Sequence, residues 1–84
     1  MTAPSAEESV SEQIEALDRE IAAFEQMISE HRTSIATLME REDPQQGIVF
    51  PGEIFTLRQD VLRIRTEIQF RRNKINRLRL GCDS

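Results

Sequence analysis

The chain has 84 residues, a formal net charge of −4 and one cysteine, Cys82. A chain of this length forms at most one small domain with a thin core, and a lone cysteine excludes an internal disulfide framework. No apolar run is long enough to span a membrane, and the first residues lack the pattern of a secretory signal. The negative charge disfavours general attraction to nucleic acid or anionic lipid. We therefore expect a cytoplasmic protein without membrane contact.

The first predicted element is a long helix over residues 5–43. Residues 5–8 read Ser-Ala-Glu-Glu, which is typical of the capping box at a helix start. Apolar residues then recur at intervals of three and four, and this heptad repeat predicts a seam against another helix. Asp43 precedes Pro44, and a residue before proline avoids helical backbone angles, so we expect the helix to end there. The seam positions are Val10, Ile14, Leu17, Ile21, Phe24, Ile28, His31, Ile35 and Leu38.

A turn is predicted over residues 44–50, because Pro44 and Gly47 interrupt the helical pattern. Turns are usually polar, yet this one contains the consecutive large apolar residues Ile48, Val49 and Phe50. Two interpretations are open. These side chains either fold back and close the end of a helical hairpin, or they form a contact surface.

The second predicted helix covers residues 51–80. Pro51 suits the first helical position because its backbone φ angle is fixed near the helical value. Gly81 suits the C-cap, where a left-handed backbone conformation is common. Apolar residues again follow the intervals of three and four, with one polar interruption. The seam positions are Ile54, Leu57, Val61, Ile64, Ile68, Arg71, Ile75 and Leu78.

The short connection favours an antiparallel pair of helices. Residues 7–30 hold eight acids and one base, whereas residues 58–79 hold eight bases and two acids, so antiparallel pairing aligns opposite charges. The predicted fold class is all-α, an antiparallel two-helix coiled-coil hairpin in one domain over residues 5–80. Residues 1–4 and 81–84 are expected to be flexible ends. Because a two-helix core is thin, we expect a homodimer in the form of a four-helix bundle.

A second apolar surface is predicted near the turn. Phe55 and Leu62 lie one heptad apart and roughly 130° from the seam centre of their helix. The acidic residues Glu42, Asp43 and Glu53 border the turn, either as helix punctuation or as a recognition edge. The predicted partner or dimer interface consists of Met39, Ile48, Val49, Phe50, Phe55 and Leu62.

Two polar residues occupy predicted seam positions. We expect His31 to be a structural residue that fixes the register of the helices, since the heptad directs it inward and a phosphorelay histidine needs solvent. Arg71 is expected to pair with Glu20 or Glu25, which the antiparallel register brings near. The sequence shows no metal-ligand spacing and no nucleophile–base arrangement, so we expect no metal, no cofactor and no enzymatic activity.

These features favour a small, non-enzymatic protein–protein interaction module that acts through helix packing and an apolar turn end. It would serve as an adaptor, an inhibitor or regulator, or an assembly subunit, and its size is typical of small bacterial or phage regulators. The expected partners are a second copy or another protein. The alternative is a nucleic-acid-binding hairpin dimer that uses the basic face of the second helix, although acids of the first helix neutralise that face. Its candidate residues are Arg65, Arg72, Lys74 and Arg79.

Overall fold

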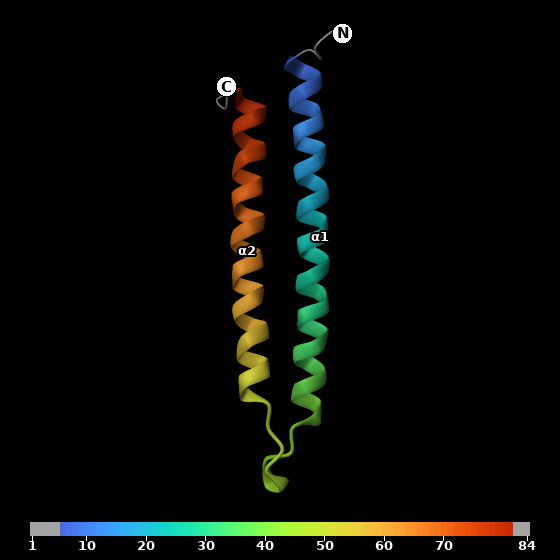
Figure 1. Cartoon of the computed structure of the whole chain (residues 1–84), viewed down its shortest axis with the longest axis vertical. Helices are drawn as coiled ribbons and strands as arrows, with labels where there is room; N and C mark the ends of the chain where they lie inside the picture. Colours follow the sequence, from blue (N-terminus) through green and yellow to red (C-terminus); the bar gives the residue numbers. More distant parts are fainter. Residues whose placement is uncertain (1–5, 82–84) are drawn as a thin grey trace.

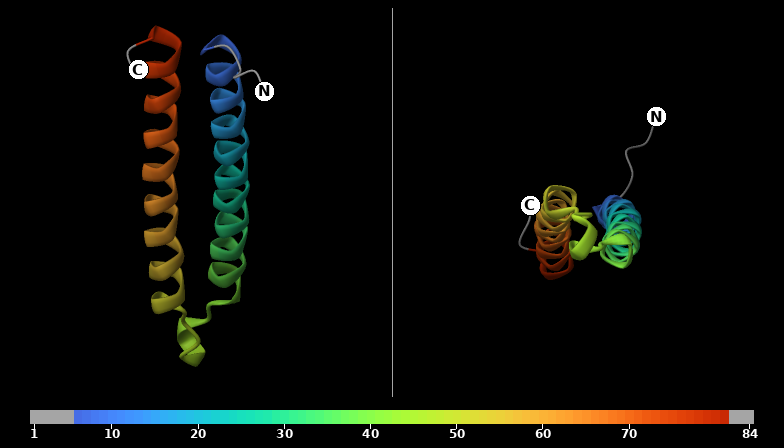
Figure 2. Two further views of the ribbon diagram at one scale, coloured as in Figure 1. Left: turned by 45° about the horizontal axis from the view of Figure 1, so that its top comes forward. Right: turned by 90° about the horizontal axis from the view of Figure 1, so that it is seen from below.

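The computed structural model describes residues 6–81, which form two long helices joined by a turn (Figure 1). Helix α1 spans Ala6–Arg41 and helix α2 spans Pro51–Leu80, with a short 3-10 helix, η1, over Pro44–Gln46 between them. The helices lie side by side and antiparallel in both figures (Figures 1 and 2). No strand occurs within residues 6–81. The predicted all-α helical hairpin is confirmed.

The core is one seam of aliphatic side chains between the two helices. Ile64 is completely buried, and every other residue that the heptad repeats assign to the seam is buried or half-buried. The molecule measures 68 × 22 × 16 Å, so it is a rod in which most residues outside the seam face solvent. The buried residues are Ile21, Ile28, Ile54, Val61, Ile64, Ile68, Ile75 and Leu78.

The two ends of α2 follow the sequence signals. Pro51 is the first residue of the helix, as predicted. Gly81 has a φ angle of 72°, and its N–H donates to the carbonyls of Arg77 and Leu78, so it is the predicted C-cap. The capping box that starts at Ser5 and the predicted flexible residues 1–4 lie outside the described residues, as do residues 82–84.

Helix α1 ends at Arg41, two residues before the predicted end at Asp43. Asp43 has φ −140° and ψ 85°, which agrees with the restriction that Pro44 places on the preceding residue. The backbone of Asp43 also pairs with that of Ile48, and this pairing removes the residue from the helical hydrogen-bond pattern. The connection therefore covers residues 42–50 rather than 44–50.

Ile64→Val tests the position of the core. We expect this loss of a buried methyl group to lower the free energy of unfolding by about 0.5–1.5 kcal/mol. Ile48→Val is the matched control, because Ile48 is 42% exposed and its change should cost less than about 0.5 kcal/mol. Urea unfolding followed by circular dichroism measures both. Equal effects of the two substitutions would contradict this core.

Candidate interaction surface at the turn end

The connection between the helices has a defined backbone structure. The Asp43 N–H donates to the Ile48 carbonyl over 2.7 Å, and the Ile48 N–H donates to the Asp43 carbonyl over 2.9 Å. Gly47, with φ 76°, closes the short helix η1 in a left-handed conformation that other residues adopt with strain. These paired backbone groups therefore hold the segment that contains Ile48 and Val49.

Phe50 folds back onto the end of α1. The guanidinium of Arg41 lies over its ring, 5.4 Å from the ring centroid. The Phe50 N–H donates to a carboxylate oxygen of Glu42 over 3.1 Å. Phe50 is half-buried as a result, so this residue fits the interpretation in which apolar turn residues close the hairpin.

The other five predicted interface residues are exposed. Their exposed fractions range from 42% for Ile48 to 63% for Phe55, and none belongs to the seam. Phe70 and Leu80 are also exposed, but they lie farther along α2, away from the turn. We call the exposed set the turn-end surface; it consists of Met39, Ile48, Val49, Phe55 and Leu62.

A groove adjoins this surface where the end of α1 meets the start of α2. Its apolar lining comes from both helices, and a carboxylate and a guanidinium also line it. Arg58 was not among the residues selected from the sequence for this surface, although it follows Phe55 by one helical turn. The lining residues are Met39, Glu42, Pro51, Ile54, Phe55 and Arg58.

The predicted acidic rim divides into two kinds of residue. Glu42 and Asp43 are half-buried; the Glu42 carboxylate accepts the Phe50 N–H, whereas Asp43 bonds to Ile48 through its backbone and its side chain does not cap η1. Glu53 is exposed in the first turn of α2, where a negative charge suits the positive end of the helix dipole. The Glu42 carboxylate therefore helps to close the turn, and it also lines the groove.

The predicted basic face is narrower than expected. Arg65, Arg72 and Arg79 are spaced by seven residues and share one side of α2, which Arg58 extends toward the turn. Lys74 lies roughly 200° around the helix from Arg72 and is half-buried, so it does not join this row. The spacing of seven could have identified Arg58 and excluded Lys74.

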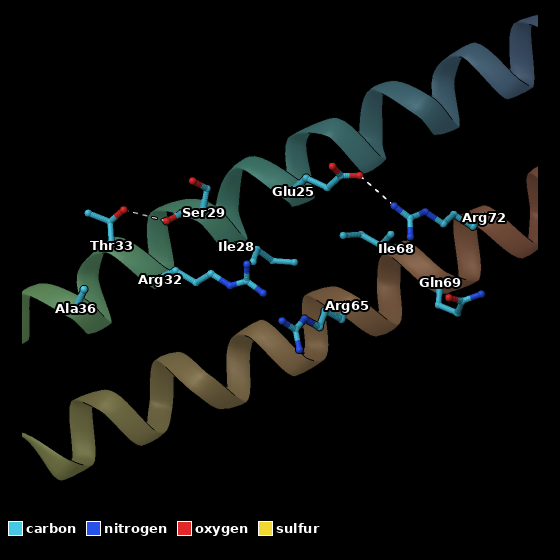
Figure 3. A pocket seen from close by; sticks show the side chains of 10 residues that line it. All are labelled: Glu25, Ile28, Ser29, Arg32, Thr33, Ala36, Arg65, Ile68, Gln69 and Arg72. Atoms are coloured by element: carbon cyan, nitrogen blue, oxygen red, sulfur yellow. Dashed lines mark hydrogen bonds and ion pairs between the residues drawn. The ribbon is translucent and has the colours of Figure 1, made fainter. Parts of the chain in front are cut away.

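Figure 3 shows how this arginine row meets α1. Arg72 Nη2 lies 3.2 Å from Glu25 Oε1, and this ion pair joins the two helices (Figure 3). One heptad nearer the turn, Arg32 and Arg65 line the same groove between the helices (Figure 3). Neither of these two arginines forms an ion pair within the part of the chain that the structure describes. Like charges therefore meet there.

His31 makes a polar contact across the seam. Its Nε2 lies 2.5 Å from Asp60 Oδ2, and Arg63 Nε donates to Asp60 Oδ1 over 2.9 Å. The hydrogen bond with His31, followed by that from Arg63, lowers the pKa of Asp60 below its ordinary value of 3.8. The seam position of His31 was predicted, but Asp60 as its partner was missed.

Arg71 forms an ion pair with one of its two predicted partners. Its Nε lies 3.7 Å from Glu20 Oε1, whereas Glu25 pairs with Arg72 instead. The guanidinium also bonds to Glu67 over 2.7 Å and lies 4.6 Å from the centre of the Phe24 ring. The antiparallel register that aligns Glu20 with Arg71 also aligns His31 with Asp60. That register could therefore have identified Asp60 as the partner of His31.

The described residues offer no metal centre, since no group of three or more His, Cys, Asp or Glu side chains could hold an ion. Neither described helix has the length and apolar character needed to cross a membrane. The chain matches no family model, no curated protein and no solved structure. Its fold defines it as an antiparallel helical hairpin.

The lowered pKa of Asp60 predicts that the stability of the fold depends on pH. Because its pKa is lowered in the folded state, the stabilisation is complete above its ordinary pKa of 3.8 and is lost as pH falls through the folded-state value. Thermal unfolding between about pH 2 and pH 6 should show this loss. Asp60→Asn should flatten this part of the profile, with Glu53→Gln as an exposed carboxylate control. If the stability of Asp60→Asn fell with pH as it does in the wild type, Asp60 would not be the source of this pH dependence.

Proposed function

We propose that the chain is a non-enzymatic protein–protein interaction module whose contact region is the turn-end surface. The observation that carries this proposal is the exposure of five large apolar side chains at one end of a charged rod. Burial of each such side chain contributes about 1.5–3 kcal/mol, so a few of them support association. Two of these residues, Met39 and Phe55, line one groove, and exposed apolar residues that gather at one site are characteristic of interaction sites.

The hairpin does not use this surface for its own core. The seam is built from other residues, and the completely buried residue Ile64 belongs to it. The paired backbone of the turn presents Ile48 and Val49 in a fixed conformation, which reduces the entropy lost when a partner binds. A rod that presents a contact surface at one end suits an adaptor, a regulator or a subunit of an assembly.

A homodimer is one form that this contact can take. A four-helix bundle along the full length would enclose charged residues that flank the seam, including Arg65 and Arg72, and desolvation of such groups is costly. The charges therefore favour a dimer that is confined to the turn end. A second copy and a different protein both remain compatible with the turn-end surface.

Nucleic acid is the second candidate, and the heptad row Arg58, Arg65, Arg72 and Arg79 favours it. Glu25 of α1 already pairs with Arg72, which neutralises one member of the row. We therefore expect weak binding to RNA or DNA at about 150 mM salt. Fluorescence anisotropy over a range of salt concentrations measures it. Tight binding that falls steeply with salt and is lost in Arg65→Glu with Arg79→Glu would favour this candidate.

The turn-end surface is tested by Phe55→Glu together with Leu62→Glu. We expect loss of self-association, or of binding to a partner purified from the host, while helicity is retained, because both changes lie off the seam. Light scattering, a binding assay and circular dichroism measure these properties. The matched control is Phe70→Glu with Leu80→Glu; Phe55 and Phe70 are 63% and 62% exposed. Unchanged assembly and binding in the first variant would refute the proposed function.

A further inference from the structure

We infer that the turn-end surface binds a second copy of this chain across a two-fold axis, with Arg58 of each copy paired to Glu42 of the other. This inference rests on the proposed function and names the partner for the same surface. It starts from the groove between the end of α1 and the start of α2, whose lining contains one base and one acid among apolar side chains.

The two charges of the groove have no counter-ion within the described chain. Arg58 Nη2 approaches the Met39 sulfur at 4.0 Å, and no carboxylate of the described residues forms an ion pair with it. Glu42 Oε2 accepts the Phe50 N–H, and the other carboxylate oxygen accepts no hydrogen bond from the described residues. Arg58 and Glu42 therefore line one groove without forming an ion pair with each other.

A two-fold interface converts this arrangement into a complementary one. In such an interface, residue i of one copy contacts residue j of the other, and j contacts i in return. Arg58 and Glu42 would then form two equivalent ion pairs, one on each side of the axis. Met39 and Phe55 of the two copies would cover each other between these pairs. A second copy supplies both charges that the groove requires.

Like charges set the limit of the interface. Arg32 and Arg65 face the groove between the helices one heptad away from Met39 and Arg58 (Figure 3). Two copies in contact along their full length would bring four guanidinium groups together, which is unfavourable. Contact therefore ends before this level. The interface is small, and we expect a weak dimer that depends on protein concentration.

The experiment reverses the charge of Arg58 in one variant and that of Glu42 in another, and then mixes the two variants. Arg58→Glu places two acids in the groove, and Glu42→Arg places two bases there, so each variant alone repels its own kind. We expect each to raise the dimer dissociation constant by about tenfold or more, which corresponds to about 1.4 kcal/mol. An equimolar mixture of the variants restores both ion pairs and should associate about as tightly as the wild type. Sedimentation equilibrium of the full chain measures all four samples.

Control variants separate charge from local structure. Arg79→Glu reverses a charge of the same arginine row, three heptads away from Arg58, and should leave the dissociation constant within about threefold of wild type. Glu42→Arg also removes the acceptor for the Phe50 N–H, whereas Glu42→Gln retains an acceptor and removes only the charge. Glu42→Gln should weaken the dimer less than Glu42→Arg. Circular dichroism checks that each variant remains helical.

Three results would overturn the inference. They are a wild-type chain that stays monomeric at its solubility limit, variants that dimerise as tightly as the wild type, and a mixture that shows no restored association. A monomeric wild type whose binding to another protein is lost in Phe55→Glu with Leu62→Glu would refute the second-copy inference and leave the proposed function standing. The two proposals therefore fail separately.

Discussion

The packing of two heptad repeats against each other is the interaction on which every other feature depends. The described chain has no third layer, so the aliphatic side chains between α1 and α2 are the whole core. A single seam gives each helix one correct face and limits the register to steps of whole heptads, because any other shift would expose apolar residues and bury charges. The antiparallel arrangement of charged residues is a consequence of that register.

The seam also explains why its two polar members are tolerated. His31 and Arg71 lie at its edge, half-buried, and both reach a carboxylate of the opposite helix. A polar group in such a position lowers stability less when it is paired, and it penalises other registers, in which the partner would be absent. The aliphatic positions supply the stability, and these two residues add specificity for one alignment.

The helices, their antiparallel pairing and the seam could be predicted from the sequence, because a long repeat of apolar residues reports directly on burial. The turn could not. Glycine and proline indicate a break, but the pairing of Asp43 with Ile48 depends on backbone geometry that side-chain patterns do not encode. For the same reason Phe50 could not be separated from Val49, although one folds back and the other is exposed.

The antiparallel hairpin places Ala6 and Gly81 at the end of the rod that is remote from Val49 (Figure 1). Thirty residues of α2, at about 1.5 Å per residue, separate the two ends by about 45 Å. Under the proposed function, the contact surface and the opposite end of the described hairpin are therefore about 45 Å apart. A probe joined near Gly81 stays clear of the turn, and the distance between probes on two associated copies distinguishes hairpins that point the same way from hairpins that point apart.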